Sequence, residues 1–279
     1  MTSAAQSNTA GNSLLHAPVR KEDNTMDRTH IAAQLYTVRD FMKTPEDIRN
    51  TLKRIREIGY EAVQLSGLGP IDPLELKNIC DELGLAICAT HVSNDLLHHD
   101  LTQIIAEHKI WNCRYVGIGS ISPDYPKTLE GYIRYAKDIS AIGRELRKHG
   151  LVLIYHNHNF EFEKFGGRIA LDILLAETDP AAVDFEIDTY WVQAGGANPV
   201  HWLKKVEGRM DVVHFKDMAI YNRQQTICEI GTGNLDWASI IDTCRNIGVK
   251  WYCIEQDSCR DGDPFASLAI SWKYLQQYL

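Results

Sequence analysis

The sequence lacks several features that mark common classes of protein. Its seven cysteines are scattered and form no CxxC pair, which argues against a disulfide framework and for reduced thiols in the cytoplasm. No apolar run reaches the roughly 18 residues that a membrane-spanning helix needs. No GxGxxG motif follows the first expected strand, so a dinucleotide site is not indicated. We therefore expect a cytoplasmic protein without a membrane partner.

Positive charge is also scarce. The 279 residues include 29 Lys and Arg against 37 Asp and Glu, which gives a formal net charge of -8. A protein whose main task is to bind phosphate backbones has the opposite balance, so we expect no nucleic-acid partner. With 44% hydrophobic and 24% charged residues, the chain has the composition of a globular protein with a large core.

The N-terminal 28 residues differ from the remainder in composition. They are rich in Ser, Thr, Ala and Asn and lack the continuous apolar segment of a secretory signal. We expect a flexible extension over residues 1–28 and a single domain over residues 29–279.

From residue 31 onward, short apolar segments alternate with amphipathic ones. Helix boundaries are marked by capping residues, as in the segment that opens with Thr44 and Pro45 and closes with Gly59. Eight strand–helix units predict a closed (β/α)8 barrel, a TIM barrel, with a doubly wound open sheet as the alternative. The strands are predicted at 31–38, 60–66, 85–91, 115–119, 151–158, 182–188, 211–217 and 251–257.

Polar residues occupy one face of several predicted strands. Side chains alternate in direction along a strand, so one parity points to the barrel axis. Buried parallel strands are normally apolar throughout, and buried charges without partners are costly. Polar inward residues near the C-terminal ends of the strands therefore indicate a site that holds a cation. The inward set is Gln64 and Ser66; Asp184, Glu186 and Asp188; His214 and Lys216; Cys253, Glu255 and Asp257.

Asp188, His214 and Glu255 stand at equivalent ends of the last three strands. Each has a simpler explanation alone: the start of a loop, a core histidine, and an ion pair with Lys216. Their coincidence favours a metal site. Carboxylates with an imidazole suit Mn²⁺, Mg²⁺, Co²⁺ or Fe²⁺ better than a structural Zn²⁺ site with thiolates, although zinc stays open.

Several segments resemble the sugar phosphate isomerase/epimerase superfamily, the xylose isomerase-like TIM barrels. They are YHNHNFEF, IDTYWVQAGGANP, RMDVVHFKD, EIGTGNLDW and CIEQD, and the resemblance runs from about Ile31 to the C-terminus. It implies a divalent metal held by a glutamate of strand five and by an aspartate, a histidine and a glutamate of strands six to eight. The last three fall on Asp188, His214 and Glu255.

The strand-five ligand is less direct. Where many members have Glu-Asn-His, this chain has His156, Asn157 and His158. We expect Glu161, further along the same loop, to supply the missing carboxylate, with His156 as the competitor for the position.

Two further motifs depart from the family pattern. Asp-Thr-Gly-His reads Asp-Thr-Tyr-Trp at 188–191, and Gly-Glu-Gly reads Gly-Thr-Gly at 231–233, preceded by Glu229. Trp191 is a sugar-stacking platform or ordinary core, and His91 ends the third strand. The residues expected at the substrate are His91, His156, Lys216, Trp191 and Glu229.

The resemblance implies a metal-dependent sugar isomerase or epimerase that abstracts a proton beside a carbonyl, with the enediolate stabilised by the metal. Glu161 and Glu255 are the catalytic candidates for that reaction, and His158 and Lys216 for elimination or hydration. A keto-sugar or inosose-type dehydratase or hydratase is the close alternative. An apurinic endonuclease and a non-catalytic sugar-binding barrel are weaker ones. The expected partner is a small sugar, keto-sugar or polyol, and a homodimer stays open.

Overall fold

The computed structural model of the chain describes Met1, residues 26–260 and residues 262–279. Most of the extension expected over residues 1–28 lies outside the described residues. Met26 is buried, and its N–H donates to the Tyr278 carbonyl at 3.1 Å. Contacts with the domain therefore begin before residue 29.

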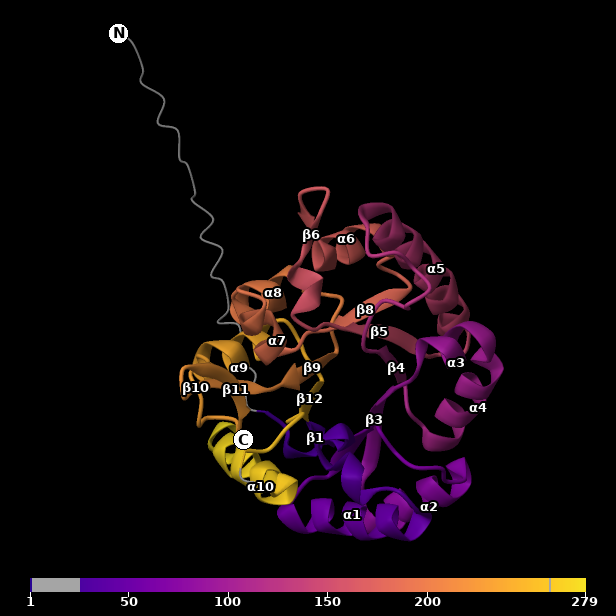
Figure 1. The fold of residues 1–279 in the computed structure, drawn as a ribbon, viewed down its shortest axis with the longest axis vertical. Coiled ribbons are helices and arrows are strands. Elements are labelled where there is room, and N and C mark those ends of the chain that lie inside the picture. The colour runs from indigo at the N-terminus through magenta and orange to yellow at the C-terminus, as the bar shows by residue number, and fades with distance from the viewer. Residues whose placement is uncertain (2–25, 261) are drawn as a thin grey trace.

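Eight parallel strands form the predicted barrel (Figure 1). Their order around the ring is β8-β5-β4-β3-β2-β1-β12-β9, with each neighbouring pair parallel. Between β8 and β9 the ring closes through an isolated bridge of Asp188 with His214. The TIM-barrel prediction is confirmed. The strands are β1 (Ile31–Gln34), β2 (Ala62–Leu65), β3 (Ala86–His91), β4 (Tyr115–Ile118), β5 (Val152–His156), β8 (Val183–Glu186), β9 (Val212–Phe215) and β12 (Trp251–Ile254).

The helices surround this ring (Figure 1). α1 shows why they start where they do: Thr44 and Asp47 form a capping box, Pro45 occupies the first turn, and Gly59 ends the helix at φ 124°. The helices are α1 (Pro45–Ile58), α2 (Pro73–Leu83), α3 (Asn94–His99), α4 (Leu101–Trp111), α5 (Leu129–Lys148), α6 (Ala170–Glu177), α7 (Thr189–Ala194), α8 (Pro199–Lys205), α9 (Trp237–Asn246) and α10 (Pro264–Leu275).

Some details differ from the predicted strands. The first strand ends at Gln34, because the Gln34 side chain accepts the Tyr36 N–H and caps a 3-10 turn over Leu35–Phe41. Two antiparallel hairpins also extend from the barrel: β6 (Lys164–Phe165) with β7 (Arg168–Ile169), and β10 (Asp217–Tyr221) with β11 (Gln224–Cys228). Further 3-10 turns are Arg28–His30, Phe160–Phe162 and Gln276–Tyr278.

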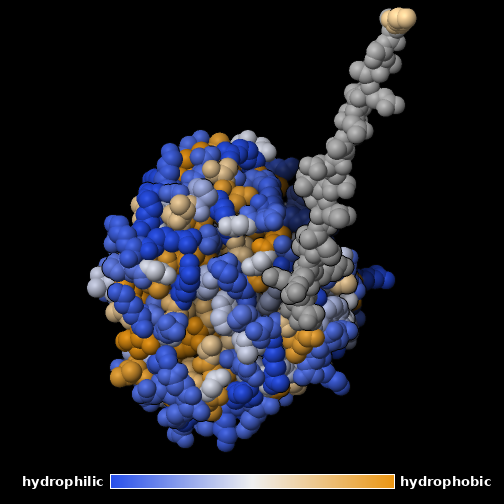
Figure 2. Space-filling model, turned by 180° about the vertical axis from the view of Figure 1, so that it is seen from behind, coloured by the Kyte–Doolittle hydropathy of each residue, from blue (hydrophilic) through white to orange (hydrophobic). Residues whose placement is uncertain are grey.

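The apolar core has two layers. Outward side chains of the strands pack under the helices, as the sequence predicts for Val63, Phe185, Phe215 and Ile254. Inside the barrel lies a separate cluster that includes small residues such as Ala32. On the face drawn in Figure 2, which lies behind the view of Figure 1, hydrophilic residues predominate and apolar ones form smaller patches between them. In the described part of the chain, no helix has the length and apolar character needed to span a membrane.

Candidate metal and substrate site

Two overlapping groups of side chains at the C-terminal ends of the strands have the composition of a metal site. In each group the ligand atoms all lie within 4.8 Å of one another. Both groups include His156 from β5 and His214 from β9, and every member except His91 is buried. The first group is His156, Asp188, His214 and Glu255, and the second is His91, His156, Glu186 and His214.

The two oxygens of Asp188 have different partners. Its Oδ1 accepts the Trp191 N–H at 2.8 Å and so caps α7, while its own N–H donates to Asn157 Oδ1 at 3.1 Å. Among the described residues, Asp188 Oδ2 and His156 Nδ1 are buried and make no hydrogen bond, although the Lys216 ammonium lies 3.0 Å from Asp188 Oδ2 as an ion pair. Burial raises the pKa of Asp188 to about 6, against the opposing effect of Lys216. Because a buried nitrogen without a partner is costly, and His156 Nδ1 stands beside buried carboxylates, the first group fits a bound cation.

Glu161 lies outside both groups. Its carboxylate accepts the Tyr155 hydroxyl at 2.7 Å and the His158 N–H at 2.7 Å. Tyr155 belongs to the outward parity of β5 and packs in the core under the helices. Burial raises the pKa of Glu161 to about 8. The structure therefore brings His156, and not Glu161, beside Asp188 and the other two expected ligands.

Lys216 lies among three carboxylates. Its ammonium is 3.0 Å from Asp188 Oδ2, 2.6 Å from Glu255 Oε2 and 2.6 Å from Asp257 Oδ2, and its side chain is fully buried. Burial alone would lower the pKa of Lys216, but these carboxylates outweigh it and raise the pKa above its ordinary value. In the same way, Lys216 and His214 overcome burial and hold the pKa of Glu255 well below its usual range. The expected ion pair of Glu255 with Lys216 is thus present within the group.

Gln64 and Glu186 connect His214 to His91. Gln64 Oε1 lies 2.6 Å from His214 Nε2, and Gln64 Nε2 donates to Glu186 Oε1 at 2.8 Å. The other Glu186 oxygen lies 2.6 Å from His91 Nε2. Burial opposes ionisation of Glu186, yet His214 and His91 hold its pKa well below the usual range. Burial would likewise lower the pKa of His214, but Glu186 and Glu255 raise it to about 10.

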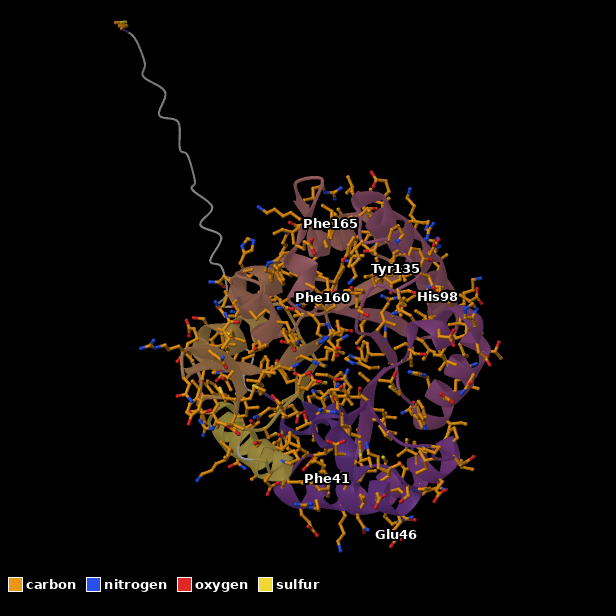
Figure 3. All side chains as sticks on the ribbon, in the orientation of Figure 1. Phe41, Glu46, His98, Tyr135, Phe160 and Phe165 are labelled. Atoms are coloured by element: carbon orange, nitrogen blue, oxygen red, sulfur yellow. The ribbon has the colours of Figure 1, made fainter. Side chains whose placement is uncertain are left out.

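Aromatic rings form a rim beside the group. The His158 ring lies 5.3 Å from Trp191 and 5.1 Å from Phe160, centroid to centroid, and Lys216 Nζ lies 5.4 Å from the Trp191 ring. Phe160 is 40% exposed and lies nearer the centre of the ring of helices than Glu46 of α1 does (Figure 3). Burial, helped by Lys216, lowers the pKa of His158 to about 4. Within the described residues, His158 Nδ1 and Trp191 Nε1 are buried and lack partners, so both can meet a ligand.

The two remaining expected contacts lie further out. Glu229 accepts the Ser267 hydroxyl at 2.7 Å and the Gln256 amide at 3.4 Å, and belongs to neither group. His91 forms part of the wall of a cavity of about 350 Å³ between the loops that follow β2 and β3. His91 therefore stands between the buried cluster and open space.

Four site residues, Gln34, Gln64, Glu186 and Asp257, were given no role from the sequence. Gln64 and Glu186 fall on the inward parity that the sequence predicts, so strand alternation was the signal for both. Gln34 ends β1 two residues after the interior Ala32, with its Oε1 bonded to the Tyr36 N–H at 2.5 Å. Its Nε2 is buried and without a partner among the described residues. Extending the parity argument to the first strand would have found it.

Comparison with known proteins identifies relatives that cover most of the chain. A family model described as xylose isomerase-like TIM barrel matches residues 52–272. The inosose dehydratase of Lacticaseibacillus casei is 24% identical over 261 residues, covering 78% of this chain and 85% of the relative.

Solved structures show the same fold. A sugar phosphate isomerase/epimerase from Parabacteroides distasonis ATCC 8503 superposes with a TM-score of 0.75 at 23% identity, covering 88% of this chain and 97% of the other. The IOLI protein, solved with a bound zinc atom, superposes with a TM-score of 0.70 at 12% identity, covering 90% and 99%. At these identities the superpositions establish architecture alone.

Proposed function

The chain belongs to the xylose isomerase-like TIM barrel family, and from this premise we propose that it is a metal-dependent enzyme that removes water from a keto-polyol of the inosose type. The observation that carries the proposal is which side chains lie next to the proposed metal ligands. A buried ammonium, Lys216, and a histidine with an unpartnered nitrogen, His158, adjoin them, while Glu161 faces away. An elimination needs such an acid and base pair. The similarity to inosose dehydratase agrees with this reaction.

The proposed ligands are His156, Asp188, His214 and Glu255. Two imidazoles with two carboxylates suit Mn²⁺, Fe²⁺, Co²⁺ or Zn²⁺, and suit Mg²⁺ less well because it prefers oxygen ligands alone. When bound, the cation would act as a Lewis acid on a carbonyl or hydroxyl oxygen of the substrate.

His158 and Lys216 would move the protons. His158 Nδ1 accepts the proton from the carbon beside the carbonyl, and the C–H electrons form the new C=C bond. The C–O bond at the next carbon breaks, and the Lys216 ammonium donates a proton to the departing hydroxyl, which leaves as water. His158 gains one proton and Lys216 loses one, so transfer through solvent restores the enzyme. Asp188, Glu255 and Asp257 keep the Lys216 donor in its charged form before the reaction.

The charge of the site favours an uncharged substrate. Glu186, Asp188, Glu255 and Asp257 contribute four carboxylates, against the single ammonium of Lys216. With His214 neutral as a metal ligand, even a divalent cation leaves one negative charge in excess. A phosphate ester would be repelled there, whereas hydroxyl groups find neutral donors and a flat ring. These are Gln34 Nε2, Trp191 Nε1 and the Trp191 face.

Isomerisation or epimerisation of the same substrates is the second candidate. Glu255 Oε2 lies 3.1 Å from His214 Nδ1, inside the proposed ligand group, where a carboxylate can also exchange a proton with a substrate carbon. The position of Glu161 leaves that reaction without the second carboxylate expected for it. Elimination is therefore the reaction we favour.

The test is incubation of the protein with an inosose and with neutral keto-sugars in D₂O, in the presence of Mn²⁺, Co²⁺ or Zn²⁺. We expect an enone product with a vinylic NMR signal and ultraviolet absorption. Formation of an isomeric sugar that contains deuterium, without loss of water, would instead establish isomerisation or epimerisation. Absence of both reactions with every metal would overturn the proposed function.

Two matched variants distinguish the loss of the proposed base, His158, from the general effect of removing a histidine. His158→Gln should lower turnover by about 10²–10⁴-fold while metal binding persists. His149→Gln is the matched control, because His149 lies near Glu145 at 3.6 Å on the outer surface. Equal turnover in the two variants would remove His158 from the reaction.

A further inference from the structure

We propose that Gln64 and Glu186 together keep a proton on His214 Nε2, so that His214 presents Nδ1 to the metal. Both are positioning residues, since they act through His214. The inference rests on the metal site of the proposed function and adds which nitrogen binds and which of the two overlapping groups holds the ion.

The hydrogen bonds fix the orientation of the Gln64 amide. An ionised carboxylate only accepts hydrogen bonds, so the NH₂ end of Gln64 must face Glu186 Oε1, at 2.8 Å. The carbonyl end then faces His214 Nε2, at 2.6 Å. Turning the amide over would set its carbonyl oxygen against the carboxylate. Such a contact between two acceptors is repulsive in a buried site.

His214 Nε2 consequently faces acceptors alone. Besides Gln64 Oε1, the Glu186 oxygen lies 3.2 Å from the same nitrogen. Neither atom can donate, so Nε2 must carry a hydrogen to avoid leaving three buried lone pairs together. All three side chains are fully buried, at 0% exposure. The protein itself therefore determines the protonation of this nitrogen.

Glu186 is in turn held from the other side. His91 Nε2 lies 2.6 Å from its second oxygen, and His156 Nδ1 lies 3.6 Å from it. The connection runs through His91, Glu186, Gln64 and His214, which come from β3, β8, β2 and β9. Four strands of the barrel thus support the orientation of a single imidazole.

This arrangement distinguishes the two candidate groups. The group with His91 and Glu186 would need His214 Nε2, which already carries a hydrogen bonded to Gln64. On the other side of the ring, His214 Nδ1 lies 3.1 Å from Glu255 Oε2 and 3.9 Å from Asp188 Oδ2. The ion therefore belongs with His156, Asp188, His214 and Glu255.

The direct test is ¹⁵N NMR of the histidine side chains in the Zn²⁺-loaded protein. His214 is assigned by the signals that disappear in His214→Gln. We expect a proton on Nε2 and the metal on Nδ1. Metal on Nε2, or a proton on Nδ1 of the loaded protein, would overturn the inference.

A variant test uses the double substitution Gln64→Leu/Glu186→Leu, which replaces buried polar groups by apolar ones of similar size, a kind of change that folds tolerate. We expect Zn²⁺ and Mn²⁺ to dissociate about 10–100-fold more readily, by calorimetry, because outer partners of ligating histidines typically contribute that much. The single variant Gln64→Leu, if the double variant is insoluble, should show a smaller loss in the same direction.

The matched control is Asp184→Asn, which removes a carboxylate from the inward parity of the same β8 but at the other end of the strand. Metal affinity within twofold of wild type in both Gln64 variants would overturn the role of the pair. Failure of the proposed function is a separate result: a protein that binds zinc through Nδ1 but does not dehydrate an inosose keeps this inference and loses that reaction. A wild-type protein that binds no metal loses both.

Discussion

At the N-terminal end of the barrel, the carboxylates of Asp184 and Asp211 accept hydrogen bonds from protein groups. At the C-terminal end, Asp188 Oδ2 makes no hydrogen bond among the described residues, and it shares the Lys216 ammonium, 3.0 Å away, with two other carboxylates. Asp184 accepts from Arg147 at 3.0 Å, and Asp211 accepts from Tyr115 at 2.7 Å and from Lys250 at 2.9 Å. The contrast occurs over a short stretch of chain, since Asp184 lies in β8 and Asp188 follows that strand, four residues further on. Protein groups satisfy these two carboxylates at the N-terminal end, whereas the polar groups at the C-terminal end need a ligand to be satisfied.

The barrel interior between the two ends shows why the difference between their carboxylates points to function. Small and apolar residues such as Ala32 and Cys253 fill the barrel below the site, which shows that the strands pack without polar groups. A buried ionic cluster stabilises less than apolar packing of equal volume. Its presence at one end therefore reflects chemistry, and not the needs of the fold.

The largest expected difference between the two ends is that between Asp188→Asn and Asp184→Asn. Loss of the Asp188 carboxylate should abolish turnover and weaken Mn²⁺ or Zn²⁺ binding by more than about 100-fold, because it is a proposed ligand and even outer partners contribute up to that much. Asp184→Asn should keep both and cost about 1 kcal/mol of stability through its pair with Arg147. Metal analysis and urea unfolding measure these effects. Similar metal content in the two variants would contradict the assigned ligand.

A smaller difference is expected between Lys216→Met and Lys250→Met. Removal of the buried Lys216 leaves Asp188, Glu255 and Asp257 without their cation, which should cost about 3–5 kcal/mol in the metal-free protein. Added Mn²⁺ should restore much of that stability but not turnover, since the proposed proton donor is gone. The Lys250 side chain is 55% exposed in its pair with Asp211, and its loss should cost less than about 1 kcal/mol. Equal thermal shifts would contradict the contrast.

The smallest effect concerns a buried histidine that belongs to neither end. His108 of α4 is bonded to Thr90 Oγ1 at 2.8 Å and to the Ile104 carbonyl at 2.7 Å, and burial lowers its pKa to about 4. In the unfolded chain His108 binds a proton near pH 6.5, whereas in the folded chain it stays neutral until about pH 4. The free energy of unfolding therefore decreases as the pH falls below about 6.5. Between pH 7 and pH 5 this should cost about 2 kcal/mol.

Urea unfolding at the two pH values tests this in His108→Leu, which should lack that part of the pH dependence. His99→Leu serves as the control, because His99 is exposed on α3. A wild-type pH dependence equal to that of His108→Leu would show that His108 titrates normally in the folded protein.

Much of the fold could be predicted because its causes are local. Apolar runs, helix caps such as Thr44 and Pro45, and terminal glycines are read one segment at a time, and eight repeats imply closure. Strand alternation then pointed Gln64, Glu186 and His214 inward, as the structure has them. The hairpin of β10 and β11 had no such signal, because its turn residues at positive φ are Asn222 and Arg223 and not glycine.

The path of the loop after β5 could not be predicted in this way. Whether Glu161 or His156 faces the axis depends on the 3-10 turn at Phe160–Phe162 and on a hydroxyl from Tyr155, which the chain supplies from the outer face of the strand. These are tertiary contacts that a spacing rule does not contain. The early end of β1 has a similar cause, since the Gln34 side chain competes with the backbone for the Tyr36 N–H.

A metal ion at the proposed site would also affect the junction of β8 and β9. There the ring is joined by the bridge of Asp188 with His214, whose amide donates to the Ile187 carbonyl at 3.0 Å. An ion bound by both side chains would link the sixth and seventh barrel strands, β8 and β9, so that metal binding would also stabilise the closure of the barrel. Deuterium exchange at the His214 amide would then be slower with the ion bound than without it. The site of the reaction would also be a site that stabilises the barrel.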